Sequence, residues 1–475
     1  MRLGLGLLAA TVLLAQTPEL HSKRPASLLI RNAMVVEGVG TPASGPRDIL
    51  IENNRITRIS PSGERPAQAA ATIDALGKYV LPGLINLHGH IQDERGGAPM
   101  DVNFCLKLWL ASGITTVRDV GSSFEKSKTL RQQSAQGAIA APRLFLYPFF
   151  NARTPADAVQ QVRDLKQNGA DGIKHLGTYR DVMEAMRGEA AKLGLRTAHH
   201  TGVEETNAWD DIRLGTTSIE HWYGIPDAAL AGEVQNFPPS YNYQNELDRF
   251  RYAGRLWREA DPKKLTRVLE AMVKANVAWD PTLNIYEASR DLERAQNHPW
   301  FADLLHPALE QFFKPNLNSH GSFFLNWTTA DEIYWRENYR IWMAALREYS
   351  QLGGLIGTGE DAGFIYQIQG FGLIRELELH QEAGFHPLTV LKHATYNGAR
   401  ILGKENEIGR VRPGWLADLI IVKGNPLDNF KLLYPTSAAL EWTIKDGIPY
   451  HAPTLLADVQ KIVAKARRQE GAGTP

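Results

Sequence analysis

The feature that most constrains this chain is a regular alternation of two kinds of segment between residues 81 and 402. Short apolar stretches such as GITTVRDVG, RLFLYPFF and LGGLIGTGEDAG alternate with longer amphipathic stretches such as ADAVQQVRDLKQNG. Strands that alternate with helices form a parallel sheet. About eight such units in a segment of this length close into a barrel. We therefore predict an α/β fold with a TIM-like (β/α)₈ barrel over residues 81–402.

The segments on either side of this barrel have a different pattern. Residues 27–80 and 403–452 contain short runs of alternating apolar and polar residues between Gly, Asn and Pro, which is typical of antiparallel strands. We predict that the two segments together build a small β-sandwich domain around the inserted barrel. Residues 453–475 are predicted to form a C-terminal tail that begins as a helix.

Residues 286–348 interrupt the alternation within the barrel. This insertion is rich in Trp and Phe and is too aromatic for a solvated loop. Two interpretations remain open: helices packed around the barrel, or a cap over the mouth of the active site. Long insertions between strand and helix at that face often shape a pocket.

The N-terminus and the overall composition bear on location and partners. Residues 1–20 place Arg2 before an apolar run that ends near Leu14, which is the layout of a signal peptide. We expect a secreted or periplasmic protein without membrane association beyond the export signal; the alternative is an uncleaved anchor. The net charge is +0 and no long Lys/Arg run occurs, so nucleic-acid binding is not expected. The single cysteine, Cys105, cannot form an internal disulfide and is interpreted as a buried apolar residue.

Ionisable residues stand at the ends of several predicted barrel strands. In a (β/α)₈ barrel the carboxyl ends of the strands meet on the face that carries catalytic groups. The first strand ends in His88-Gly89-His90, and residues two apart in a strand share a side. Later strand ends supply Lys174 and His175, His199 and His200, His221, and Glu360 and Asp361. Each alone could be structural, but imidazoles combined with a carboxylate suit Zn²⁺ or a similar ion.

Alternation along each strand divides these residues further. His175 points away from Lys174 and is interpreted as structural. The stretch AHHTG permits either His199 or His200 as a ligand, and the spacing to Gly202 favours His199.

Several stretches together resemble the metal-dependent amidohydrolase superfamily, in its imidazolonepropionase-like and prolidase-like branch. They are VLPGLINLHGHI, SGITTVRDVG, GADGIKHL, TTSIEHW, and ATYNGARILG followed by IGRVRPGWLADLIIVKGNPL. The resemblance covers residues 27–450 except the aromatic insertion. It implies hydrolysis of an amide or peptide C–N bond in a small-molecule or dipeptide-like substrate. A dipeptidase-like enzyme or an N-acyl-amino-acid amidase is the expected activity, and a homo-oligomer the expected assembly.

The resemblance also implies roles for the strand-end residues. Two divalent ions are expected, Zn²⁺ with Mn²⁺ or Co²⁺ as alternatives, sharing a hydroxide. One ion would be bound by His88, His90 and Asp361, and the other by His199 and His221. Lys174 would bridge them as an N6-carboxylated lysine, because a bare ammonium group cannot ligate a cation. Asp361 would also be the catalytic acid and base.

Alternatives remain for the substrate. A lactonase, a phosphotriesterase-like enzyme or a cyclic-amide hydrolase could use the same site, whereas a deaminase is less favoured because a mononuclear deaminase does not need Lys174. A noncatalytic binding protein on the same scaffold is the alternative from a different class. Tyr147 and Tyr223 are candidate substrate contacts, and Arg118 and Arg180 are candidate partners of a substrate carboxylate. Glu360, beside Asp361, could also take part.

Overall fold

The structure of the protein is a computed structural model, and it describes residues 19–64, 68–201, 205–233, 235, 237–238, 240, 246–316 and 327–472. The predicted signal peptide, residues 1–20, lies almost entirely outside the described residues. Within them, none of the helices is both long enough and apolar enough to cross a membrane.

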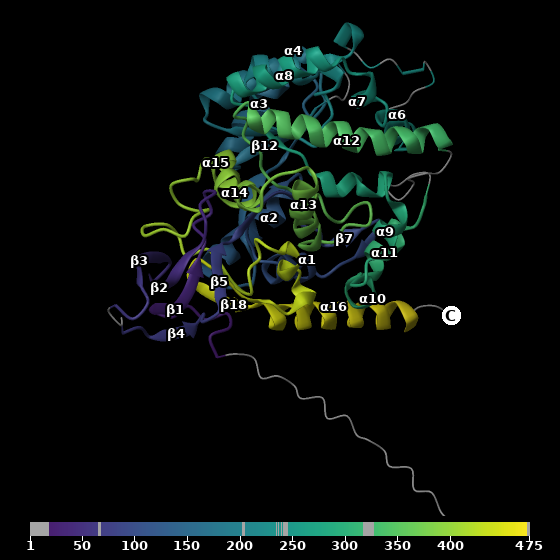
Figure 1. Ribbon diagram of the computed structural model, residues 1–475. Coiled ribbons are helices and arrows are strands. Elements are labelled where there is room, and N and C mark those ends of the chain that lie inside the picture. The colour runs from purple at the N-terminus through teal and green to yellow at the C-terminus, as the bar shows by residue number, and fades with distance from the viewer. Residues whose placement is uncertain are drawn as a thin grey trace, which may run out of the picture.

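Parallel strands form the barrel at the centre of the molecule (Figure 1). They are β6 (Leu84–Gly89), β9 (Ile114–Val120), β10 (Arg143–Tyr147), β12 (Gly172–Leu176) with the short β11 (Phe149–Phe150) beside it, β13 (Arg196–His200), β14 (Ser218–Glu220) and β15 (Ala278–Asp280). The last position is taken by residues 355–358. There Ile356 forms a parallel bridge with Trp279, and the Leu87 amide donates to the Thr358 carbonyl at 2.9 Å. The last position thus contacts the first strand, which closes the barrel as predicted.

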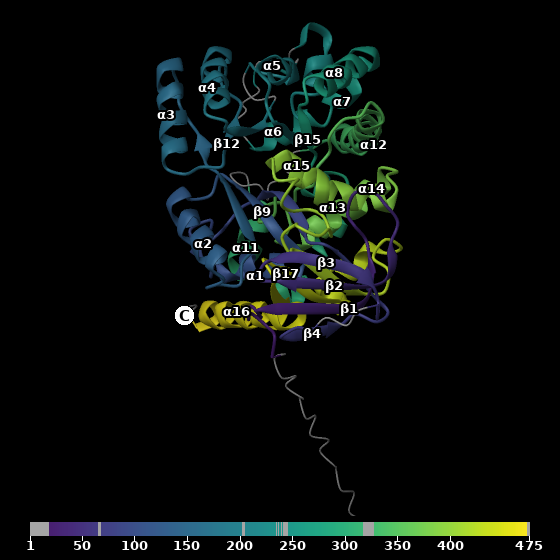
Figure 2. The same cartoon turned by 90° about the vertical axis from the view of Figure 1, so that its left-hand side faces the viewer.

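Helices cover the outside of the barrel, and Figure 2 shows α2, α3 and α4 along one flank. The helix α8 (Pro262–Lys274) illustrates why these segments are helical. Its Leu265, Val268, Leu269 and Met272 are buried, a spacing that places one apolar stripe against the barrel. The Asp261 side chain accepts a hydrogen bond from the Lys264 amide, and Pro262 occupies the first turn, so the start of the helix is well capped.

Further helices surround the strands or connect them. They are α1 (Asn103–Ala111), α2 (Phe124–Gln136), α3 (Pro155–Gln167), α4 (Arg180–Lys192), α5 (Ala208–Leu214), α6 (Glu246–Ala253), α7 (Leu256–Glu259), α13 (Phe371–Glu382), α14 (Pro387–Lys392) and α15 (Gly398–Leu402). Short helical turns are η1 (Asp227–Ala229), η2 (Ala231–Glu233), η4 (His393–Asn397), η5 (Phe430–Leu433) and η6 (Pro435–Ser437), and a small hairpin is made by β7 (Glu94–Arg95) and β8 (Ala98–Pro99).

The two terminal segments form one eight-stranded sheet, in the order β18-β17-β16-β5-β1-β2-β3 with β4 beside β1. The strands are β1 (Ser27–Val35), β2 (Ser44–Glu52), β3 (Arg55–Pro61), β4 (Ala71–Asp74), β5 (Lys78–Pro82), β16 (Leu419–Lys423), β17 (Leu440–Lys445) and β18 (Ile448–His451). Antiparallel pairing of β5 with β16 joins the segments. Their apolar residues share one core, to which β1, β2, β5, β16 and β17 all contribute. The predicted fold class, a barrel with a small β domain from both ends of the chain, is confirmed.

The aromatic insertion is largely helical where the structure describes it. It comprises η3 (Leu283–Ser289), α9 (Leu292–Gln296), α10 (Phe301–Leu304), α11 (Pro307–Phe313) and α12 (Thr329–Gln351). Trp335 and Trp342 of α12 are buried and pack on Tyr286, with ring centroids 6.0 Å apart in both pairs. Residues 317–326 lie outside the described residues. The C-terminal helix α16 (Ala452–Ala472) packs against α1.

Candidate metal centre and substrate pocket

A pocket of about 620 Å³ opens at the carboxyl ends of the barrel strands. Its lining includes a group of ionisable side chains that come from five strand ends or from the residues just after them: His88, His90, Lys174, His200, His221 and Asp361. The rest of the lining is mainly apolar or aromatic. Ionisable groups gathered in an apolar pocket are typical of an active site.

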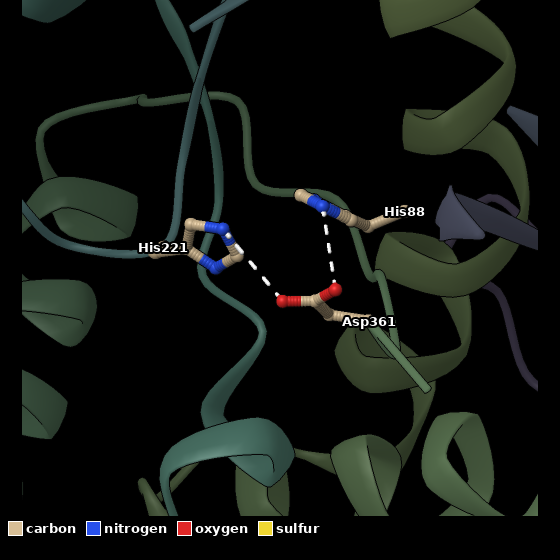
Figure 3. A group of neighbouring side chains, drawn as sticks. All are labelled: His88, His221 and Asp361. Carbon is tan, nitrogen blue, oxygen red and sulfur yellow. Dashed lines mark ion pairs between the residues drawn. The ribbon is translucent and has the colours of Figure 1, made fainter. Parts of the chain in front are cut away.

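Asp361 lies between His88 and His221 (Figure 3). Its Oδ1 lies 3.0 Å from His90 Nε2 and 3.7 Å from His88 Nε2, and its Oδ2 lies 3.8 Å from His221 Nε2. One ligand atom each from His88, His221 and Asp361 all lie within 4.8 Å of one another. Two imidazoles and a carboxylate at this separation fit a divalent cation such as Zn²⁺.

The backbone at two of these residues adopts a conformation that side chains other than glycine rarely take. The φ angles of His221 and Asp361 are +61° and +47°. Each amide is held by a neighbouring barrel strand: the His221 amide donates to the Asp280 carbonyl and the Asp361 amide to the His88 carbonyl, both at 2.8 Å. Left-handed backbone of this kind costs about 1–3 kcal/mol per residue and is concentrated at functional sites. The barrel therefore holds both side chains toward the pocket against a local conformational cost.

Lys174 lies beside this group with only 2% of its surface exposed. Its Nζ has no hydrogen-bond partner within the part of the chain that the structure describes. Burial lowers the pKa of this amine, although the nearby carboxylates of Glu220 and Asp361 oppose the shift. The uncharged amine, which burial favours, is the form that can react with CO₂ or ligate a metal.

At the end of β13 the residue that lines the pocket is His200, whereas the sequence analysis predicted His199. In the parallel register, Leu176 is opposite His200 and His175 is opposite His199, so His200 shares the face of Lys174. His200 lines the pocket, and its ring lies 4.6 Å from that of His221. His199 is fully buried on the outer face of the strand, where its Nδ1 lies 2.7 Å from Asp211 Oδ1.

A fully buried charge network lies next to the metal candidates. Arg118 donates to both carboxylate oxygens of Glu220 at 2.8 Å and to Asp280 at 3.3 Å. Glu220 Oε2 also lies 2.8 Å from His88 Nδ1. A carboxylate on Nδ1 fixes the tautomer that leaves His88 Nε2 free to bind a metal. Burial, followed by the charge of Lys174, holds the pKa of His88 well below its usual value, so its imidazole is neutral and suited to ligation.

Comparisons with known proteins bear on this arrangement. The profile described as the Amidohydrolase family matches residues 326–450. A dihydroorotase from Trichlorobacter lovleyi is 26% identical over 226 residues, 44% of this chain and 51% of that enzyme. The chain thus spans about half the length of the dihydroorotases that it matches. A 5-methylthioadenosine/S-adenosylhomocysteine deaminase from Desulforudis audaxviator is 36% identical over 492 residues, 93% of this chain and 97% of that enzyme. This chain belongs to the amidohydrolase family.

The fold of this protein matches solved structures over nearly its whole length. The crystal structure of a Xaa-Pro dipeptidase with methionine bound in its active site superposes with a TM-score of 0.65 at 21% identity. The match covers 90% of this chain and all of that chain. The predicted fold is therefore confirmed. The family predicted from the sequence motifs is confirmed by the family profile and by the 36% identical relative.

Of the two predicted substrate contacts, one lines the pocket and the other does not. Tyr223 lines the pocket, with its ring stacked 5.0 Å from that of His200. Tyr147 does not: it is 1% exposed, lies outside the pocket lining and fills the space that glycine leaves at position 172. The prediction that Tyr147 contacts the substrate is wrong, because its side chain packs between β10 and β12.

Glu360 is also a structural residue. Its side chain is fully buried, accepts hydrogen bonds from Trp109 Nε1 and from the amides of Gly370 and Leu373, and thereby fixes the start of α13. Burial raises its pKa to about 7. It does not line the pocket.

Sequence reasoning missed Glu220 and Asp280 and gave Arg118 a different role. Arg118, predicted as a candidate partner of a substrate carboxylate, is fully buried outside the pocket lining and pairs with Glu220 and Asp280. A signal was present, because each is a charged residue within or at the end of a buried strand: VRDV, which also contains Asp119, SIE and AWD. A charge on a buried strand needs a buried partner. Three such strands therefore implied a shared network, although not which residues would meet.

Proposed function

We propose that this protein is a metal-dependent hydrolase that cleaves the C–N bond of small amides or peptides. The observation that carries the proposal is the convergence of His88, His221 and Asp361 beside the buried amine of Lys174, which has no partner within the part of the chain that the structure describes. The rest of the pocket lining is mainly apolar or aromatic. Cation ligands next to an amine that can be carboxylated fit a pair of divalent ions, and the apolar lining fits an organic substrate.

The proposed ligand sets follow the strand ends. His88, His90 and Asp361 would hold one ion, His200 and His221 the other, and Lys174 would contribute to both after carboxylation of its Nζ. Zn²⁺ is the proposed metal, with Mn²⁺ and Co²⁺ as alternatives. Divalent ions at this position supply Lewis acidity toward the scissile carbonyl and lower the pKa of a bound water.

Asp361 is the proposed acid and base. Its side chain is 15% exposed and faces the pocket, whereas Glu220 and Asp280 are fully buried. Asp361 would accept a proton from the attacking water and deliver it to the nitrogen of the departing amine. Glu220 has a positioning role, because it holds the Nδ1 side of His88 and leaves Nε2 directed to the site.

Within this class we propose a dipeptidase-like or N-acyl-amino-acid amidase activity. Support comes from the fold shared with the Xaa-Pro dipeptidase and from the similarity to dihydroorotases. A second candidate is deamination, which is favoured by the relative named a deaminase that matches nearly the whole chain. Lys174 favours amide hydrolysis, because a bridging lysine belongs to a site for two ions.

The test uses protein stripped of metal and reloaded with Zn²⁺, Mn²⁺ or Co²⁺ in bicarbonate buffer. The reloaded protein is assayed on a panel of dipeptides, N-acyl amino acids and aminopurine nucleosides. We expect about two equivalents of bound metal per chain, amine release from the amides, and loss of turnover in Asp361→Asn with metal still bound. Ammonia release from the nucleosides alone would establish the deaminase instead. Absence of metal binding together with absence of turnover would refute both candidates.

A further inference from the structure

We infer that Arg153 selects the substrate: it binds a carboxylate carried by the leaving amine, while Phe149, Leu176 and Tyr179 hold an apolar side chain of the same amine. This inference rests on the proposed amide hydrolysis and narrows its substrates to N-acyl derivatives of apolar amino acids.

Arg153 lies on the pocket wall next to the barrel strands. Residues 151–153 connect β11 to α3, and all three line the pocket. The Thr154 side chain caps the next helix by accepting a hydrogen bond from the Asp157 amide, which anchors the backbone that follows Arg153. The exposed Arg153 side chain therefore extends from an anchored backbone at the edge of the site.

The charge of Arg153 is uncompensated in the described part of the chain. No ion pair or hydrogen bond within the described residues involves its side chain, whereas Arg163 pairs with Glu189 and Arg180 with Asp210. Asp361, at the metal centre, is the acidic residue among those that line the pocket. The outer part of the pocket thus presents a cation without a carboxylate, and a carboxylate on the ligand would complete it.

The same wall exposes large apolar side chains. Phe149 is 43% exposed, Leu176 41% and Tyr179 50%, and all three line the pocket. They come from β11, from the end of β12 and from the loop after β12, and β11 pairs directly with β12. Apolar side chains gathered at the mouth of a pocket mark a binding surface better than isolated ones elsewhere.

The opposite part of the lining is already closed by packing. Tyr286 is 3% exposed and is backed by Trp335 and Trp342 of the aromatic insertion. Phe250 and Ile285 beside it are also buried. This closed wall suits an uncharged acyl group, whereas the wall with Arg153 suits the amino-acid part of the substrate. Arginine recognises a carboxylate with two parallel hydrogen bonds, which gives orientation as well as affinity.

The test compares N-acetyl-L-leucine with N-acetyl-3-methylbutylamine, which has the same side chain but lacks the carboxylate. For the metal-loaded wild type we expect a preference for the first compound. Arg153→Met should raise KM for N-acetyl-L-leucine about 10- to 100-fold with kcat nearly unchanged, because a hydrogen-bonded charge pair contributes to ground-state binding. The KM for N-acetyl-3-methylbutylamine, which lacks the carboxylate, should be the same in Arg153→Met as in the wild type. Arg163→Met, on the following helix α3 and outside the pocket lining, is the matched control.

A binding measurement separates this inference from the proposed function. Calorimetric titration of the metal-free protein with N-acetyl-L-leucine should show the same loss of affinity in Arg153→Met, whether or not the compound is hydrolysed. Binding that depends on Arg153, together with no turnover of any compound of the panel by the metal-loaded protein, would overturn the proposed function but would leave Arg153 as the residue that binds the carboxylate. Hydrolysis or binding that Arg153→Met does not change would overturn the inference, as would an absence of binding to the wild type. Tyr179→Ala should reduce the preference for N-acetyl-L-leucine over N-acetylglycine.

Discussion

Replacement of Arg118 by methionine should be among the most damaging single changes in the barrel. Arg118 is fully buried and donates to Glu220, Asp280, the Ser218 hydroxyl and the Leu87 carbonyl. Methionine fills much of the volume but leaves the buried Glu220 carboxylate without its cation. Removal of one partner from a buried ion pair costs about 3–5 kcal/mol. We expect a loss of this size in the free energy of unfolding, measured by urea denaturation followed by tryptophan fluorescence.

A double-variant cycle identifies the cause of that loss. Glu220→Gln in the Arg118→Met background removes the uncompensated charge, so the double variant should be at least about 1 kcal/mol more stable than the sum of the single effects implies. Arg163→Met removes one of the two cations that pair with Glu189. Because the Arg163 side chain is 57% exposed and Glu189, itself only 5% exposed, keeps its pair with Lys192 at 3.1 Å, the cost should be no more than about 1 kcal/mol. Equal losses at Arg118 and Arg163, or strict additivity in the cycle, would refute the argument that the network depends on charge compensation.

Three further outcomes are expected. His200→Ala should release about one equivalent of bound metal, measured by plasma emission spectrometry, whereas His199→Ala should retain both because its side chain faces away from the pocket. Burial lowers the pKa of His298 from 6.5 to about 4. The unfolded chain therefore binds a proton more readily than the folded protein, and the free energy of unfolding should fall by at most about 3 kcal/mol as the pH drops from about 6.5 toward 4. His298→Phe should weaken this pH dependence, measured by urea denaturation. Gly172→Ala would place Cβ 2.3 Å from the Tyr147 ring, and overpacking should lower the free energy of unfolding by about 1–3 kcal/mol, measured in the same way.

The barrel and most of its strand-end residues could be predicted because both follow from local pattern. The alternation of strands and helices determines a parallel barrel, and the barrel determines where the strand ends meet. His88, His90, Lys174, His221 and Asp361 therefore reach one pocket, as their positions in the sequence imply. The resemblance of several sequence motifs to those of the amidohydrolase superfamily also allowed the family to be predicted.

The choice between His199 and His200 could not be made from spacing alone. The two residues are adjacent, so the answer depends on which face of β13 points inward, and the register with β12 determines that face. The prediction that Tyr147 contacts the substrate was wrong for a related reason, because the side chain at a strand end can also pack inside the barrel, below the pocket. The pairing of Arg118 with Glu220 and Asp280 depends on strand neighbours across the closed barrel, which local pattern does not give.

The pairing of β5 with β16 has a consequence for how the protein is made. The first strands emerge from the ribosome long before their partner, which is synthesised only after the entire barrel. Until then the edge of β5 is an open template for association with other chains, since unpaired strand edges are prone to aggregation. Contacts so distant in sequence also form slowly. Production of the active protein should therefore depend on chaperones that shield this edge while translation continues.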